Sequence, residues 1–117
     1  MNFNERSQNY GKTSSNKDNF DKEVLQAEKP VVLDFWAPWC GYCRRLGPVV
    51  DRLAAQYEGN LLVGKVDIDE SPELEEKHEI ETIPTLIVYQ GGRASEPLIN
   101  PGSMTEIEDW LKENGAV

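Results

Sequence analysis

Short apolar runs alternate with helical patterns along most of this chain, and that alternation restricts the fold more than any other feature. Runs typical of buried strands span residues Val31–Trp36, Leu61–Ile68 and Thr85–Tyr89. Helical patterns separate these runs, so we expect the strands to pair in parallel through right-handed crossovers. The sequence therefore predicts an α/β fold in which a mixed central sheet of four to five strands carries helices on both faces.

The strongest helical pattern follows the first of these strands. Its apolar positions recur at the spacing of one helix face over about four turns, and they are Leu46, Val49, Val50, Leu53, Ala54 and Tyr57. Pro48 lies within this stripe, and we expect a kink there because proline lacks the N–H that a helix needs. Gly59 is suited to end the helix. A shorter helix is expected before the strand, over Phe20–Ala27, with Asn19 or Asp21 as its cap.

Two further helices and a hairpin complete the predicted order. The pair Ser71-Pro72 is suited to the cap and first position of a third helix. Gly91-Gly92 predicts a tight turn, from which Arg93–Ile99 returns as an antiparallel strand. Pro97 within that strand indicates an edge position. The last helix spans Ser103–Asn114 and begins with an S-x-x-E capping box.

Composition sets the domain count and excludes several kinds of partner. The chain has 117 residues, enough for one domain. Its first nineteen residues are almost all polar, so we expect residues 1–19 to form a disordered arm and residues 20–117 to form the domain. The formal net charge of −9 disfavours nucleic acid and anionic membranes as partners, because both require clustered cations. No apolar run has the length of a signal-peptide core or a membrane span, so we expect a cytoplasmic protein.

The only two cysteines, Cys40 and Cys43, lie three positions apart, shortly after a predicted strand. A structural disulfide between them would close so small a loop that it would contribute only about 2 kcal/mol to stability. A closed zinc site needs four ligands, whereas this pair supplies two. The single histidine, His78, lies in the charged helical stretch "ELEEKHEI", where we expect it on the surface. We therefore expect no metal site, and a redox role remains for the pair.

Redox chemistry suits the position of the pair at the start of the long helix. Unpaired N–H groups and the helix dipole favour an anion there, which lowers the pKa of a thiol and enriches the reactive thiolate. Cys40 is nearer the helix N-terminus and better exposed, so we expect it to be the nucleophile that forms a mixed disulfide. Cys43, one turn further along, is expected to resolve that intermediate.

Several motifs around the pair resemble the thioredoxin family. They are "VVLDFWAPWCGYC", Gly47-Pro48, "VGKVDID" around Lys65 and "TIPT" at Thr82–Thr85, all in the order and spacing of that family. The resemblance covers the chain from about Phe20 to its C-terminus. It implies a thioredoxin fold and a thiol–disulfide oxidoreductase whose only redox group is the Cys40–Cys43 pair, with no other cofactor.

The resemblance also implies roles for individual residues. Asp34 matches the family's buried acid, suited to take and return a proton when Cys43 attacks, and Lys65 matches the lysine near it. A carboxyl group in an apolar strand would be partly protonated, whereas the alternative is that Asp34 points to solvent from a strand edge. Pro84 matches a proline that follows a cis peptide bond, and the Ile83 backbone before it can pair with an extended substrate. The expected substrate-contacting residues are Trp39, Gly41, Tyr42, Thr82, Ile83, Pro84 and Gly102.

Three features depart from the family pattern. Tyr42 replaces the usual proline between the cysteines, and it either restores a backbone N–H that points toward the Cys40 sulfur or serves only as a surface contact for partners. The family's first strand should precede Phe20, but "YGKTSSNKD" has no apolar alternation, so we expect that strand to be degraded or absent. Asn100 stands where the family has a glycine, in a loop that helps to grip substrates.

Together these features predict a cytoplasmic, monomeric protein that reduces the disulfides of other proteins and receives electrons from a thioredoxin reductase-type donor. A more oxidising disulfide oxidase or isomerase is an alternative within the same chemistry, because Tyr42 changes the redox pair. The alternative from another class is a redox-inactive interaction module with the thioredoxin fold.

Overall fold

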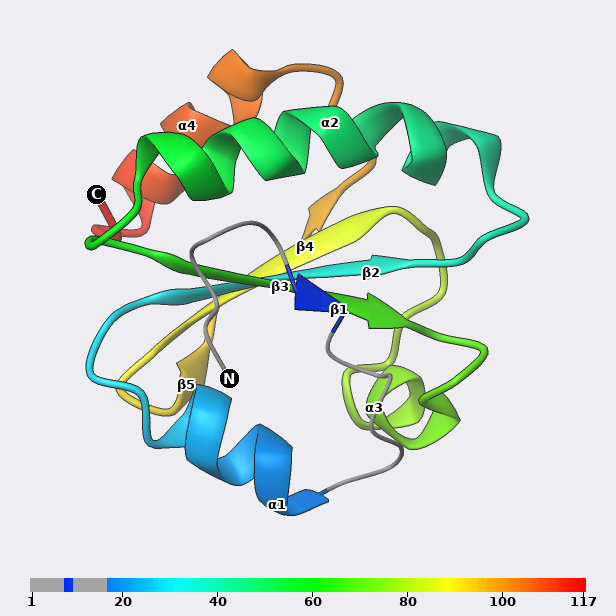
Figure 1. Cartoon of the computed structure of the whole chain (residues 1–117), viewed down its shortest axis with the longest axis horizontal. Coiled ribbons are helices and arrows are strands. Elements are labelled where there is room, and N and C mark those ends of the chain that lie inside the picture. Colours follow the sequence, from blue (N-terminus) through cyan, green and yellow to red (C-terminus); the bar gives the residue numbers. More distant parts are fainter. Residues whose placement is uncertain (1–7, 10–16) are drawn as a thin grey trace.

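The computed structural model describes residues 8–9 and 17–117 of the chain (Figure 1). The strands are β1 (Gln8–Asn9), β2 (Val31–Trp36), β3 (Leu62–Asp67), β4 (Thr85–Gln90), β5 (Arg93–Ala94) and β6 (Leu98–Ile99). The helices are α1 (Lys17–Phe20), the π-helical segment η2 (Asp21–Leu25), α2 (Gly41–Gln56), α3 (Pro72–Lys77) and α4 (Met104–Glu113).

The strands form one mixed sheet in the order β1-β3-β2-β4-β5, with β6 also paired to β4. The β1–β3 and β2–β3 pairs are parallel, whereas β4 runs antiparallel to β2, β5 and β6. Because β2 occupies one edge of β4, the short strands β5 and β6 share its other edge, and the sheet is five strands wide. The predicted mixed sheet is confirmed.

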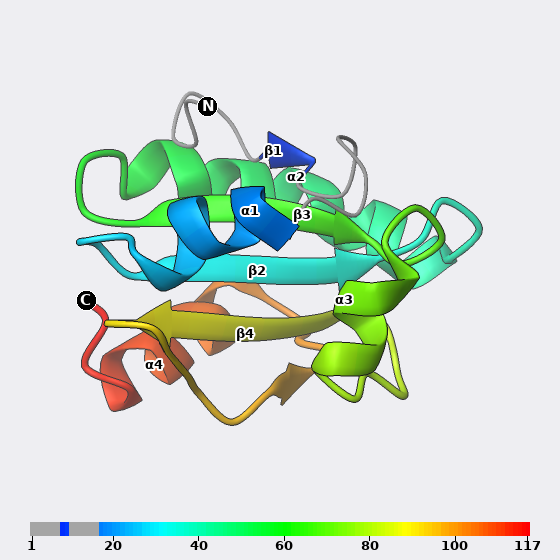
Figure 2. The same ribbon diagram turned by 90° about the horizontal axis from the view of Figure 1, so that it is seen from below.

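Helices cover both faces of this sheet, with α2 and α4 on one face and α1, η2 and α3 on the other (Figures 1 and 2). The alternation of side chains along β2 explains the division. Val31, Leu33 and Phe35 join the apolar cluster under η2 and α3. Val32 joins the cluster under α2 and α4, and Asp34 faces α2 from the same side of the strand.

The N-terminal part of the domain differs from the expectation in two ways. The first helix begins at Lys17 and continues into η2, so Asn19 lies within it and does not cap it. Phe20 and Val24, which are four residues apart, are both buried, and this pair holds the segment against the sheet. The family's first strand is present as the two-residue β1 beside β3, which agrees with a degraded strand and not with an absent one. The rest of the predicted arm, residues 1–7 and 10–16, lies outside the described residues.

The returning strand of the hairpin is broken into β5 and β6, whereas the sequence predicted one strand over Arg93–Ile99. Gly91 and Gly92 have φ angles of 58° and 80°, as the predicted tight turn requires. The Ser95 hydroxyl then accepts from the Val88 N–H at 3.0 Å, which replaces a backbone acceptor. Pro97 has no N–H to donate, so regular pairing resumes only at Leu98. The predicted edge position is confirmed.

The last helix is capped nearly as its sequence predicts. The Ser103 hydroxyl accepts from the Glu106 N–H at 3.2 Å. The Glu106 carboxylate, however, accepts from the Gly102 N–H at 2.8 Å, one residue before the donor that a capping box uses. Ile107, Trp110 and Leu111 form the buried face of the helix.

Two further helix signals have mixed outcomes. Ser71 and Pro72 take the predicted cap and first positions of α3, but the Ser71 side chain makes no capping hydrogen bond. Pro48 lies inside α2, and the kink expected there stays a prediction. Within the described part of the chain, no helix is both long and apolar enough to cross a membrane.

Candidate active site

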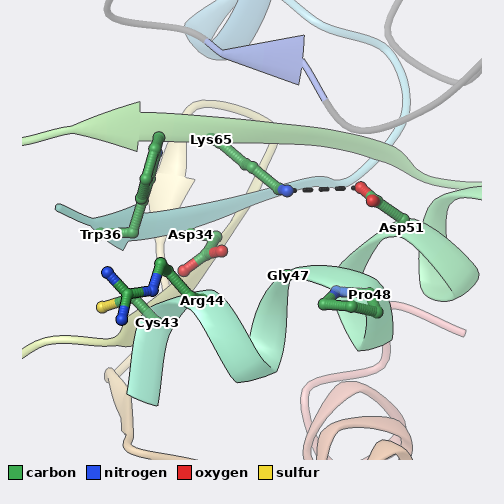
Figure 3. Close-up of a pocket in the computed structure, with 8 residues that line it drawn as sticks. All are labelled: Asp34, Trp36, Cys43, Arg44, Gly47, Pro48, Asp51 and Lys65. Atoms are coloured by element: carbon green, nitrogen blue, oxygen red, sulfur yellow. Dashed lines mark ion pairs between the residues drawn. The ribbon is translucent and has the colours of Figure 1, made fainter. Parts of the chain in front are cut away.

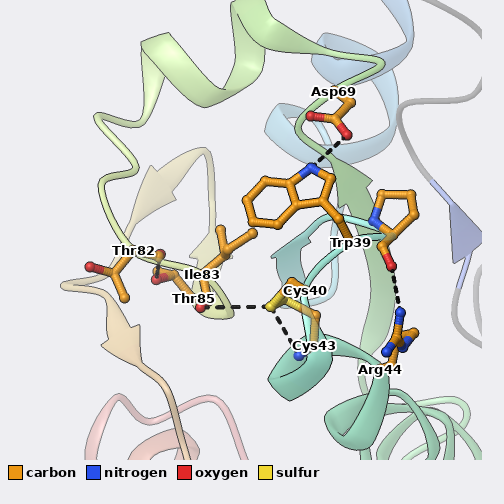
Figure 4. Close-up of a disulfide and its surroundings, with 9 residues drawn as sticks. Trp39, Cys40, Cys43, Arg44, Asp69, Thr82, Ile83 and Thr85 are labelled. Atoms are coloured by element: carbon orange, nitrogen blue, oxygen red, sulfur yellow. Dashed lines mark hydrogen bonds between the residues drawn. A yellow bond between two sulfur atoms is a disulfide. The ribbon is translucent and has the colours of Figure 1, made fainter.

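The two cysteines lie where the chain leaves β2 and enters α2, and they form a disulfide (Figure 4). Cys40 is the N-cap residue of α2, with extended backbone angles, and Cys43 lies in the first turn. Their Cα atoms are 5.2 Å apart. Cys40 is 8% exposed and Cys43 only 3%, so Cys40 is the more exposed residue of the pair, as predicted.

Two backbone groups face the Cys40 sulfur. The Cys43 N–H donates to Cys40 Sγ at 3.2 Å, and the Ile83 carbonyl oxygen lies 4.0 Å from the same sulfur. Among the described residues the donor is therefore the amide of Cys43 and not that of Tyr42, so our expectation for the Tyr42 N–H is wrong. The reason is geometric: a side chain at the N-cap reaches the amides of the second or third helical residue, and Cys43 occupies the third.

Asp34 shares a pocket of about 260 Å³ with Cys43, the inner cysteine of the disulfide (Figure 3). The pocket is lined by Asp34, Trp36, Cys43, Arg44, Gly47, Pro48, Asp51 and Lys65. Asp34 is 1% exposed, and among the described residues its Oδ1 has no hydrogen-bond partner. The alternative in which Asp34 points to solvent from a strand edge is therefore wrong, because β2 is covered on both sides by β3 and β4.

Burial dominates the electrostatics of Asp34. Desolvation raises the pKa of this carboxyl from 3.8 to about 7, the positive charge of Lys65 lowers it, and the negative charge of Asp51 raises it. Lys65 itself forms an ion pair with Asp51, with 3.3 Å between Nζ and Oδ1 (Figure 3). The sequence predicted Lys65 beside Asp34 but not its partner Asp51, which lies on α2 and meets β3 only in the folded chain.

Trp39, one of the expected substrate-contacting residues, lies beside the disulfide (Figure 4). The residue is 66% exposed, and its Nε1–H donates to Asp69 Oδ2 at 2.9 Å (Figure 4). Sequence reasoning missed Asp69, although it is the last residue of the "VGKVDID" motif. The contact fixes the ring over the redox pair because one end of the indole is tied to the loop after β3.

The loop before β4 brings Thr82, Ile83 and Pro84 to the disulfide, and the Ile83–Pro84 peptide bond is cis, as expected. Asn100 has a φ of 50° and donates its N–H to the Pro84 carbonyl at 2.8 Å. A left-handed backbone explains why a glycine suits this position and why asparagine can replace it. Sequence reasoning noted Asn100 but assigned only Gly102 to the site.

Gly41, Tyr42 and Gly102 lie at the rim of the site. Gly41 is the first residue of α2 and is exposed. Tyr42 is 61% exposed, and it lines a second pocket together with Gly102. These three residues therefore lie near the N-terminus of α2, whereas Lys65 meets α2 at Asp51, further along that helix.

His78 is not the surface residue that its charged neighbours suggested. It is half-buried, and its ring contacts the rings of Phe20, Phe35 and Tyr89. Its Nδ1 donates to the Leu74 carbonyl, and its Nε2 faces the Tyr89 hydroxyl. The last turn of α3 packs against the sheet, which turns this position inward. Within the described residues, no three side chains of the kinds that bind metals come together.

Comparison with known proteins agrees with this geometry. The family model for thioredoxin matches residues 11–113. The chain is 42% identical to thioredoxin 1 of Nostoc sp. over 81% of this chain and 89% of that protein. It is 40% identical to a thioredoxin of Synechocystis sp. over 80% and 88% of the two chains. It is 45% identical to the chloroplastic M-type thioredoxin of Chlamydomonas reinhardtii over 72% and 60%.

These matches and the Cys40–Cys43 disulfide favour neither of the alternatives, a more oxidising disulfide oxidase or isomerase and a redox-inactive interaction module. Thioredoxins act on substrates that contain disulfides. The chain belongs to the thioredoxin family and is a thiol–disulfide oxidoreductase.

Proposed function

We propose that this oxidoreductase works as a reductant of protein disulfides, with Cys40 as the nucleophile and Cys43 as the resolving thiol. The observation that carries the proposal is the position of the pair, with Cys40 capping α2 and Asp34 buried beneath Cys43. In the reduced protein, the Cys43 N–H and the N-terminus of α2 stabilise a Cys40 thiolate.

The reaction consists of two exchanges. The Cys40 thiolate attacks one sulfur of the substrate disulfide, so a mixed disulfide forms and the other substrate sulfur leaves as a thiolate. The Cys43 thiolate then attacks Cys40 Sγ, which restores the Cys40–Cys43 disulfide and releases the second substrate thiol. The substrate gains two electrons, and this protein loses two.

Asp34 serves the second exchange as the base that removes the Cys43 proton. A carboxyl group with a pKa of about 7 is partly ionised at neutral pH, so it can accept a proton and return it later. Lys65 acts as a positioning residue, because its charge favours the ionised form of Asp34 while its ion pair with Asp51 holds it at the mouth of the pocket.

The substrate contacts the exposed rim around Cys40. In this proposal the Ile83 backbone, which precedes the cis bond to Pro84, pairs with an extended substrate segment. Trp39, Gly41, Tyr42, Thr82 and Gly102 surround that segment. The exposure of Trp39 and Tyr42 supports this role, because large apolar side chains left open to solvent commonly mark binding surfaces.

The proposal extends to the partners and the compartment. A thioredoxin reductase-type enzyme returns the disulfide to the dithiol, and the protein acts as a monomer in the cytoplasm. Both cysteines of the chain belong to the redox pair, so neither is used for a structural disulfide, as suits a reducing compartment.

A trapping experiment tests the roles of the two cysteines. The reduced protein should reduce a protein substrate with an accessible disulfide, and Cys40→Ser should abolish the activity. Cys43→Ser should form mixed disulfides that persist until a small thiol is added. Normal turnover by Cys43→Ser would contradict the proposed roles.

The direction of the reaction needs a separate measurement. Equilibration with glutathione buffers should give a potential closer to about −270 mV than to the −120 mV of a strong oxidase. A potential near the oxidising value would favour an oxidase instead.

A further inference from the structure

A second pocket, of about 370 Å³, opens beside the redox pair. One wall comes from α2 and the other from the loop between β6 and α4. The lining residues are Tyr42, Arg45, Leu46, Val49, Asn100, Pro101 and Gly102. Because Tyr42 is only two residues after Cys40, a substrate segment held at Cys40 passes next to this pocket.

Arg45 supplies the only charged side chain in this pocket's lining. Its guanidinium carbon lies 4.5 Å from the centroid of the Tyr42 ring, and both side chains are exposed. Stacking on the ring restrains the plane of the guanidinium but leaves its N–H edges able to donate. Among the residues that the structure describes, no carboxylate forms an ion pair with Arg45.

The neighbouring Arg44 serves as a contrast. Its Nη1 donates to the Pro38 carbonyl at 3.1 Å, and its side chain lines the Asp34 pocket (Figures 3 and 4). Of the two adjacent arginines, one is therefore used within the chain, and the other faces the pocket beside the substrate.

The charge of Arg45 stands out against its surroundings. The chain has 21 acidic and 12 basic residues, yet no carboxylate lines this pocket. Glu79 and Glu81 instead line a different pocket, together with Thr82 of the cis-proline loop.

We propose that the pocket between Tyr42 and Arg45 binds a carboxylate side chain of the substrate protein, from a glutamate or aspartate close to the cysteine under attack. The fork of a guanidinium matches a carboxylate, and the apolar walls at Leu46 and Val49 suit the methylene groups that carry it. The proposal rests on the proposed function, since it names the kind of disulfide segment that the enzyme prefers.

Peptides with one cysteine test this preference. The cysteine is held as a mixed disulfide with 2-thiopyridine, and glutamate, glutamine or lysine is placed at each of three positions on either side. When the Cys40 thiolate of the reduced protein attacks the peptide sulfur, thiopyridone leaves and is measured by absorbance. When the varied residue lies on one side of the cysteine, the glutamate peptide should react about threefold to tenfold faster than the glutamine peptide. This ratio of the two reaction rates should fall with added salt.

Variants connect the preference to the pocket. Arg45→Gln should bring the glutamate-to-glutamine ratio to about one, and Arg45→Glu should favour lysine. Tyr42→Phe keeps the ring and should keep the ratio, whereas Tyr42→Ala should lower it. The matched control is Arg52→Gln, which removes the same charge from an exposed position of α2 outside this pocket and should keep the wild-type ratio.

The outcomes separate this inference from the proposed function. If the wild-type protein reacts equally with glutamate and glutamine peptides, or if Arg52→Gln lowers the ratio as much as Arg45→Gln, the carboxylate pocket is overturned and the reductase stands. If the wild-type protein reacts with none of the peptides, the proposed function fails with it.

Discussion

Asp34 shows how one residue can oppose stability and serve chemistry at the same time. Its carboxyl group is buried, and its Oδ1 has no hydrogen-bond partner in the described part of the chain. Removing a charged group from water without a partner is costly, so the folded protein favours the neutral acid. The same cost raises the pKa to about 7, where a proton can be exchanged at neutral pH.

Replacing Asp34 with asparagine should therefore stabilise the protein in a pH-dependent way. Because the folded pKa lies above the ordinary 3.8, the folded state binds the proton more tightly, and stability falls as pH rises from about 4 to about 7. The loss is at most on the order of 4 kcal/mol for a pKa difference of about three. Urea unfolding of the oxidised protein at pH 4.5, 6 and 7.5 should show a growing advantage for Asp34→Asn.

The same variant should turn over more slowly near neutral pH, because the amide cannot accept the Cys43 proton. Asp109→Asn, on the exposed surface of α4, is a matched control that should change neither property. If Asp34→Asn is less stable at every pH, the carboxyl group is a satisfied structural acceptor, contrary to our reading.

Individual helices and strands show where the local sequence is sufficient to predict the limits of an element. The helix α4 begins and ends within one residue of its predicted limits, because its cap, its apolar face and Gly115 all agree. The single strand predicted after Gly91-Gly92 is split into β5 and β6, because Ser95 and Pro97 both interrupt its backbone hydrogen bonds with β4. The alternation of apolar and polar residues that predicts a strand does not reveal where a serine hydroxyl will replace a backbone acceptor.

Loss of the α4 cap should destabilise the domain measurably. Ser103→Ala removes the hydroxyl that accepts from the Glu106 N–H, and such a loss costs about 1 kcal/mol. Ser103→Asp keeps an acceptor at the helix N-terminus and should restore most of that stability. Denaturant midpoints of the three proteins, measured at pH 7 with equal slopes, provide the comparison. Equal stability for Ser103→Ala would mean that water satisfies the Glu106 N–H as well as the hydroxyl does.

At the scale of the whole molecule, the sheet separates two titrating groups with opposite effects. Asp34 faces α2 on one side, and His78 packs among aromatic rings on the other. Burial lowers the pKa of His78, with a further lowering by Lys77 and an opposing effect of the Leu74 carbonyl. As the pH falls, His78 is therefore protonated in the unfolded chain before it is protonated in the folded protein. The stability contributed by neutral His78 is lost as the pH falls below about 6.5.

The single histidine makes this effect measurable. Its ring protons should titrate in the folded protein with a pKa below 6.5. Relative to His78→Gln, the wild-type protein should lose stability between pH 7 and pH 5, while Asp34 adds the opposite slope to both proteins. A titration at or above 6.5 would contradict the buried, neutral ring.

The amino-acid sequence alone was enough to predict the order of most elements, the position of the redox pair and the chemistry of the pair. These features depend on local signals, such as the apolar run of β2, the stripe of α2, and caps and glycines at the turns. A buried strand followed by two cysteines and a helix places the sulfurs at a helix N-terminus in any arrangement of the rest.

Which side chains meet at the site depends on the tertiary structure. Asp51 reaches Lys65 from another element, Asp69 ties down Trp39, and the Cys43 N–H, not that of Tyr42, faces the Cys40 sulfur. His78 turns inward because α3 packs on the sheet, although its neighbours in sequence are charged. Such contacts depend on how elements distant in sequence are oriented and packed, and apolar periodicity carries no information about those orientations.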